Sequence, residues 1–328
     1  MKRVLPVLIS FFLINQISLS QTPDKKGYPI IEIFTNFHYS INDTSKNSGF
    51  GIERAFLGYT YPAGENFSAT VVVNISNPDE VVAGTKTRRF AHFREAFISY
   101  SKDKLILNMG ITKTLMANYQ QKFLEKRYIA DNLLSMREFG YVSDLGVSAC
   151  YRFNDLIQAD ISLMNGKGYS SIQYDNNLKT SLGIYITPGN LAIRLFGDIM
   201  KRENDWQSTM VGFAGFKNDM LTLGAEMSYK KNLGISEGCD AWGFSGTGSV
   251  NISDKLDLFA RYDWSSSAII MTDFTRWNHV EDGRLIIGGI EYSYSKKIKF
   301  SLNYQGTHPI DINKKASELI YVNSMFRF

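Results

Sequence analysis

The chain has 328 residues, of which 44% are hydrophobic and 13% aromatic, so it is too apolar to be a disordered protein. A formal net charge of +4 is too small to indicate a nucleic-acid-binding protein, and no RNA-binding or zinc-finger motif is present. The length allows two average domains or one large β domain. Only 7 prolines occur, which favours many uninterrupted strands.

The first 20 residues have the pattern of a secretory signal peptide. Lys2 and Arg3 precede an apolar run over 4–14, and Ser18 and Ser20 put small residues before Gln21. An anchoring helix is the alternative, but the apolar run is shorter than the ~20 residues that a spanning helix needs. We therefore expect secretion through the inner membrane and a mature domain of residues 21–328.

Along the mature chain, apolar and polar residues alternate with period 2, which predicts strands with one apolar face. We expect about 16 strands of about 8–12 residues, the length that a tilted membrane strand needs. The clearest apolar faces begin at Ile31, Phe67, Leu105, Leu145, Leu191, Leu221, Leu256 and Ile298. A transmembrane barrel needs only one apolar face per strand, so its mean hydropathy resembles that of a soluble protein.

Short and long connections alternate between these strands. Tight polar turns are predicted at 62–66, 102–104, 154–155, 188–190, 217–220, 253–255 and 295–297. Longer connections are predicted at 42–49, 77–91, 113–142, 166–177, 201–206, 231–240, 265–283 and 306–317. A soluble β-sandwich also alternates, but it has no reason to put every long loop at one end. The pattern therefore favours an all-β, transmembrane antiparallel barrel with short periplasmic turns and long external loops.

Aromatic residues recur near the predicted strand ends, on the apolar face. Examples are Tyr59, Tyr61, Tyr100, Tyr151, Phe153, Tyr229, Tyr262, Trp264, Tyr304, Phe326 and Phe328. Aromatic rings with polar tips favour the membrane interface, so the recurrence supports the barrel prediction.

The final stretch, "SELIYVNSMFRF" over 317–328, is predicted to be the closing strand. Ile320, Val322, Phe326 and Phe328 would face lipid, and the strand would pair with the first one near 30–41. A terminal Phe also resembles the end that the outer-membrane barrel assembly machinery recognises, so we expect that machinery and membrane lipid as partners.

Several stretches resemble bacterial outer-membrane porins of the phosphate-selective O/P type. They are "GFGIERAFLGYTYPAGENFSATVVVNIS" (49–76), "FREAFISYSKDKLILNMGITKTLM" (93–116), "LLSMREFGYVSDLGV" (133–147) and "ISLMNGKGYS" (161–170). The resemblance covers about half of the chain and implies a 16-stranded barrel, a homotrimer and a third loop that folds inward to narrow the pore.

The longest connection, 113–142, fits that inward loop, since it has helix-like stretches and no strand alternation. If this connection folds into the barrel, its basic residues would make the constriction attractive to anions, because a narrow pore focuses the field of a few charges. A solvated external loop is the alternative. The candidate pore-lining and constriction residues are Lys113, Lys122, Lys126, Arg127, Arg137, Arg54, Glu95, Arg152, Arg194 and Arg261.

The basic and acidic side chains that are predicted to face the lumen from the strands nearly cancel in charge. Phosphate specificity therefore does not follow from the resemblance. "ERAFLGY" and "REAFISY" even exchange the sign of the predicted inward residue, Arg54 against Glu95. We expect most inward charges to belong to salt-bridge networks in the lumen. The passage would then be only weakly selective, with a possible lean towards anions.

An enzyme is not expected. A hydrolase needs a nucleophile paired with a base, which is most often a histidine, and the chain has only four histidines. "GFSGTGS" (243–249) lacks the ending and the helix of a phosphate-binding loop, and small residues of a strand explain it. "DNN" (175–177) and "NPDE" (77–80) are polar enough to bind a cation but are more typical of turns.

The sequence thus predicts a passive channel for small hydrophilic solutes or inorganic anions in a Gram-negative outer membrane, without a cofactor, a metal or nucleic acid. Two alternatives remain open at this point. One is a barrel whose loops bind a nutrient or surface partner, and the other is a barrel hydrolase.

Overall fold

A computed structural model describes residues 26–42, 48–75, 91–202, 205–233, 237–268, 282–310 and 314–328. The predicted signal peptide and the "NPDE" stretch lie outside these residues. The strands are β1 Tyr28–Ser40, β2 Gly49–Pro62, β3 Phe67–Ile75, β4 Ala91–Lys102, β5 Leu105–Lys113, β6 Ser143–Arg152, β7 Ile157–Met164, β8 Lys179–Ile186, β9 Leu191–Arg202, β10 Asp205–Lys217, β11 Leu221–Lys231, β12 Ala241–Ser253, β13 Leu256–Ser267, β14 Gly283–Ser295, β15 Ile298–Pro309 and β16 Ser317–Arg327. Two short helices, α1 Asn118–Leu124 and α2 Leu133–Met136, lie between β5 and β6.

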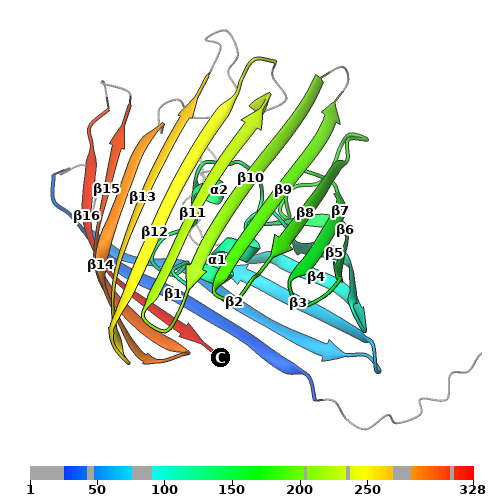
Figure 1. Ribbon diagram of the computed structural model, residues 1–328, viewed down its shortest axis with the longest axis horizontal. Helices are drawn as coiled ribbons and strands as arrows, with labels where there is room; N and C mark the ends of the chain where they lie inside the picture. Colours follow the sequence, from blue (N-terminus) through cyan, green and yellow to red (C-terminus); the bar gives the residue numbers. More distant parts are fainter. Residues whose placement is uncertain are drawn as a thin grey trace, which may run out of the picture.

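Each strand pairs antiparallel with its neighbours in sequence, and β1 pairs with β16 to close a barrel (Figure 1). The closing register runs from Glu32 opposite Arg327 to Ser40 opposite Leu319. Closure leaves no strand edge unpaired, as a membrane barrel requires. The predicted all-β transmembrane barrel and its closing strand are therefore confirmed.

The two faces of each strand differ in the way that the alternation predicts. On β16, Val322 is 48% exposed on the outside, whereas Asn323 and Met325 are 1% and 3% exposed on the inside. On β1, Tyr39 is exposed outward and Phe34 is buried inward. The outer surface is thus an apolar face for lipid. None of the helices in the described ranges is long and apolar enough to cross a membrane.

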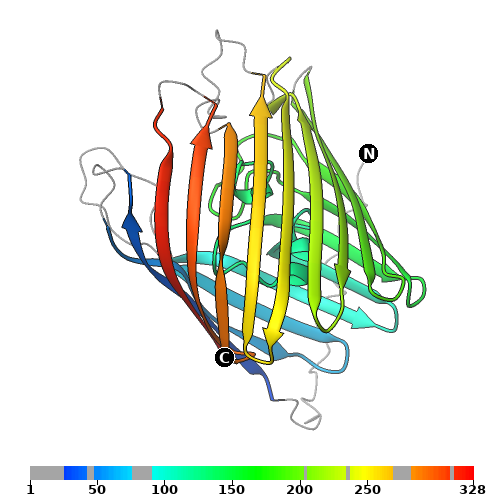
Figure 2. The same ribbon diagram turned by 60° about the vertical axis from the view of Figure 1, so that its left-hand side comes forward.

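The seven predicted tight turns all lie between paired strands, at the end of the barrel where the chain terminates (Figures 1 and 2). We call this end the turn side and the opposite end the loop side. One predicted long connection, 201–206, is wrong, because Arg202 of β9 and Asp205 of β10 are already paired with each other. The strands run to 14 residues in β2 rather than the 12 predicted.

Residues 114–142, here called the inner loop, lie inside the barrel with both helices (Figures 1 and 2). Inward-facing glycines make room for the loop on the wall. A Cβ on Gly215 would lie 2.5 Å from Phe123, and one on Gly224 or Gly243 would lie 2.8 Å from a leucine of the loop. Real Cβ atoms do not approach other atoms so closely, so larger residues there would displace the loop.

Two apolar clusters hold the inner loop in the lumen. The first contains Met116, Ala117, Leu134 and Phe139 of the loop and side chains of β9, β10 and the region around β12. The second contains Tyr128 and Ile129 of the loop with side chains of β1, β13, β14 and β16. The loop is therefore packed at both its base and its tip rather than exposed to solvent on the loop side.

Candidate functional site: the lumen and its inner loop

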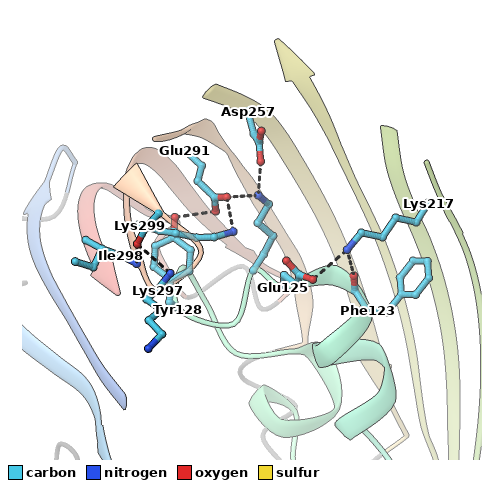
Figure 3. Close-up of polar contacts among 11 residues, drawn as sticks. Phe123, Glu125, Tyr128, Lys217, Asp257, Glu291, Lys297, Ile298 and Lys299 are labelled. Carbon is cyan, nitrogen blue, oxygen red and sulfur yellow. Dashed lines mark hydrogen bonds and ion pairs between the residues drawn. The ribbon is translucent and has the colours of Figure 1, made fainter. Parts of the chain in front are cut away.

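The tip of the inner loop is bound to the wall by a buried network around Glu291 (Figure 3). Glu291 of β14 is 2.9 Å from the Nζ atoms of both Lys126 and Lys299, and it accepts a hydrogen bond of 2.8 Å from Tyr128 Oη. Lys126 also lies 3.3 Å from Asp257 of β13. Burial and the neighbouring Glu291 carboxylate raise the pKa of Tyr128, so its hydroxyl remains a donor at neutral pH.

Other wall side chains bind the main chain of the loop. Arg194 donates to Leu115 O at 2.7 Å, Lys230 to Phe139 O at 2.9 Å and Gln305 to Ile129 O at 3.1 Å. Arg261 donates to Asp131 O. These bonds satisfy carbonyl groups of irregular backbone that lies away from bulk water. They come from β9, β11, β13 and β15, so the loop lies along that half of the wall.

Opposite this half, three guanidinium groups converge, which we call the arginine cluster: Arg54 of β2, Arg94 of β4 and Arg127 of the inner loop. Arg54 lies over the Phe34 ring at 4.9 Å, and Phe34 packs edge-on against Tyr128, the neighbour of Arg127 in the loop. Arg54 is 3.2 Å from Glu32, which Arg327 shares at 3.0 Å. Arg127 is 2.7 Å from Asp131.

Arg94 differs from the other two arginines of the cluster. Its guanidinium lies over Tyr169 at 5.0 Å and over Phe56 at 5.7 Å, and none of the described residues forms an ion pair with it. Phe56 also lies under Arg54, at 4.5 Å, so the two cations share one ring. The cluster therefore presents positive charge that carboxylates neutralise only in part.

Two β-bulges bring extra charges into the lumen at this level. The register of β2 shifts at Glu53, and the register of β4 shifts at Arg94, so that an additional residue turns inward in each strand. Glu53 accepts from Asn36 Nδ2 at 2.7 Å inside the barrel, and Arg94 and Glu95 are both buried. The sequence predicts that Arg54 is the inward residue of β2 here and Glu95 that of β4, and this is wrong. Both Glu53 and Arg54 face the lumen from β2, and both Arg94 and Glu95 face it from β4. Each strand therefore contributes a cation and a carboxylate.

The ten residues that the sequence predicts for the pore fall into groups by their contacts. Arg54 and Arg127 belong to the arginine cluster, and Glu95 is 3.3 Å from Lys113 beside it. Lys126, Arg194 and Arg261 bind the inner loop to the wall, and Arg137 is buried after α2. Lys122 and Arg152 lie together at the turn side of the loop. The predicted salt-bridge networks are confirmed, as in the 2.8 Å pair of Arg194 with Asp160.

The sequence reasoning missed Arg94, Tyr128 and Tyr169. Strict alternation from an inward Glu95 would turn Arg94 outward, and a bulge leaves no clear mark in a single sequence. Tyr169 belongs to the "NGKGYS" stretch, whose glycines have positive φ at 166 and 168. Glycine spacing there could have indicated a loop that folds back onto the wall.

The weaker motifs have structural roles. "GFSGTGS" lies within β12, where Gly243 makes space for Leu133. In "DNN", Asp175 accepts from the backbone of Asn177 at 3.2 Å and lies 3.0 Å from Lys167, which lowers the pKa of that carboxyl. No group of three His, Cys, Asp or Glu residues in the described ranges is arranged to hold a metal ion.

The sequence matches no protein-family model and no curated protein. Solved structures of outer-membrane proteins, in contrast, share the fold. OmpF of Salmonella typhi in complex with daunomycin has a TM-score of 0.67 at 11% identity, over 92% of this chain and 98% of that one. OmpT of Vibrio cholerae has a TM-score of 0.62 at 12% identity, over 92% of this chain and 97% of that one. The outer membrane channel DcaP of Acinetobacter baumannii has a TM-score of 0.60 at 15% identity, over 92% of this chain and 96% of that one. The chain therefore has the fold of the outer-membrane porins and channels.

Proposed function

We propose that the protein is a passive diffusion channel of a bacterial outer membrane for small hydrophilic solutes, with a preference for anions. One observation carries this proposal: the inner loop is fixed to one half of the wall, and the arginine cluster lies where the loop tip meets the other half. With the loop inside the barrel, the free passage would be narrowest beside the loop, and the cluster would place positive charge there.

The physical basis of anion preference is the field inside a narrow, low-dielectric passage. Protein walls focus the field of a few charges, so two or three partly neutralised cations change the local concentration of anions. Arg94 forms no ion pair with any of the described residues, so its charge adds to the field of the lumen without a carboxylate beside it that is bound to it.

Most other lumenal cations are paired with carboxylates, which argues for weak rather than dedicated anion selectivity. Lys299, Arg194 and Arg261 each have a carboxylate within 3 Å. We therefore infer that phosphate passes as one of several inorganic anions, and that solute size decides permeability first.

We also propose that the protein is not an enzyme. His38 in β1 faces the lumen, but its Nδ1 lies 3.3 Å from Asn36 and its ring packs on Tyr321, so it has structural partners. A nutrient-binding barrel with a blocked lumen is the main alternative.

Uptake into liposomes distinguishes the channel from the blocked barrel. Liposomes that contain the folded protein are expected to take up glucose, and to take up gluconate faster, because the two solutes are of similar size but only gluconate is charged. Liposomes without protein are the control. Uptake of neither solute would contradict the proposal and favour a blocked barrel.

We propose a homotrimer in the outer membrane as the working assembly. One neighbour, OmpT of Vibrio cholerae, was solved in a trimer form. The outer face over β3–β8 has an apolar hollow of about 700 Å³ that is lined by residues such as Ile98, Leu107 and Met109. Chemical cross-linking in native membranes is expected to give a species of three chains, and a single-chain species alone would contradict this assembly.

A further inference from the structure

On the turn side of the inner loop, the lumen contains a cavity of about 580 Å³. Side chains of α1 line one part of it, and the β6–β7 turn and the end of β8 line another. Its volume is within the range of small-molecule sites, roughly 300–1,000 Å³. The arginine cluster does not line it.

Three aromatic rings from two elements form one side of this cavity. Tyr119 and Phe123 of α1 are stacked, with centroids 6.3 Å apart and an interplanar angle of 26°. Tyr185 of β8 meets Tyr119 at 4.8 Å and 58°. All three rings line the cavity, but the Arg194 guanidinium lies over the Tyr185 ring at 3.8 Å. The rings of Tyr119 and Phe123 are only partly buried, so their surface remains open to a solute. A planar ring stacks well on such a surface.

Two cations line the same cavity without a partner. The side chains of Lys122 and Arg152 are exposed, and neither has a hydrogen bond or ion pair with any residue in the described ranges. Asp155 is the one acidic residue among those that line the cavity, so the side chains give two positive charges against one negative. Elsewhere in the lumen, cations such as Arg194 and Lys299 are bound to carboxylates.

The neutral polar groups around the cavity are less available. Asn154 Oδ1 already accepts from the backbone of Leu156 and Ile157, and Asn118 Nδ2 donates to Thr114 O. A neutral polyol would need such groups, since its hydroxyls bind through paired donors and acceptors. Besides Gln158 and Asp155, the open groups are therefore rings and cations.

We propose that this cavity is a binding site for small organic anions that carry a planar ring. The ring would stack on Tyr119 and Phe123, and the carboxylate would lie between Lys122 and Arg152. The solute class rests on the proposed channel function, but the site itself can be tested without any conductance. A site at the turn side would hold such solutes after they leave the passage beside the loop.

The test uses three probes: benzoate, its neutral analogue benzamide, and acetate, which has the charge without the ring. Isothermal titration calorimetry of the folded barrel in detergent is expected to show that benzoate binds more tightly than either of the others. Arg152→Gln should weaken benzoate by roughly three- to five-fold, as expected for one solvent-accessible charge contact, and leave benzamide unchanged. Lys297→Gln, in the exposed β14–β15 turn, is the matched control and should change nothing.

Tyr119→Leu is expected to weaken both benzoate and benzamide, because both use the ring surface. If that variant does not fold, Lys122→Gln on the exposed face of α1 should reproduce the effect of Arg152→Gln. Equal binding of benzoate and acetate, or no effect of Arg152→Gln, would overturn the proposal.

Planar bilayers separate this inference from the proposed function. Open channels without benzoate binding would refute the site alone. Benzoate binding that depends on Arg152, in a protein that never opens, would refute the channel and leave the site in place.

Discussion

Arg94 and Glu95 are neighbours in the chain, and both are buried in the lumen because a bulge in β4 turns an extra residue inward. Period-2 alternation predicted the side of the barrel for most residues, such as Val322 outward and Asn323 inward. It could not predict Arg94, because a bulge depends on the pairing of β4 with β3 and not on the local sequence.

Replacing Arg94 by Gln is expected to lower the preference for anions. One unit charge at about 8 Å from an ion in a water-like medium contributes about 0.5 kcal/mol, so the ratio of anion to cation permeability should fall about two-fold. The zero-current potential under a KCl gradient measures this ratio. Lys102→Gln, at the exposed end of β4, should leave it unchanged; an equal shift in both variants would rule out a special role for Arg94.

Glu291→Gln is expected to destabilise the folded barrel, because it leaves Lys126 and Lys299 without their shared carboxylate. Charge-assisted hydrogen bonds of this kind contribute about 1.5–3 kcal/mol. The temperature at which the folded band is lost on semi-native gels should therefore fall, whereas Glu65→Gln in the exposed β2–β3 turn should not change it. An unchanged transition for Glu291→Gln would show that the network does not hold the loop.

At the scale of elements, the tight turns were predictable because polar residues interrupt the alternation between each pair of strands. The inner loop was identified by its length, its helix-like stretches and its resemblance to porin loops. What could not be predicted was how it packs: Gly215, Gly224 and Gly243 lie on three strands, and their match to Phe123, Leu124 and Leu133 exists only in the folded barrel.

Gly224→Val is expected to displace α1 from the wall, since a Cβ there meets Leu124 at 2.8 Å. Single-channel recordings should then show a changed conductance and larger current noise. Gly288→Val is the matched control, because a Cβ at Gly288 meets nothing within 4 Å. Identical recordings for the two variants would contradict the packing described for the loop.

Deletion of Phe328 is expected to reduce the folded fraction in the outer membrane. The amide of Phe328 donates to Ile31 O at 2.9 Å, so the residue continues the pairing of β16 with β1. Ile252→Ala, which removes a similarly exposed apolar side chain near another turn, is the control. Fractionation and semi-native gels measure the result, and an equal effect of the two changes would mean that the last residue has no particular role.

The whole molecule is a closed barrel with an inner loop fixed to one half of the wall and an arginine cluster where the loop tip meets the other half. Each part has a structural cause: β1–β16 pairing closes the barrel, two apolar clusters hold the loop, and two bulges bring charges inward. Together they predict an open, narrow and weakly anion-preferring passage.

Single-channel recordings of the purified, folded protein in planar bilayers under a KCl gradient test whether the barrel is an open, anion-preferring passage. Discrete open steps and a zero-current potential on the anion-selective side are expected. Bilayers without open steps would contradict the channel, and a potential on the cation-selective side would contradict the role of the arginine cluster.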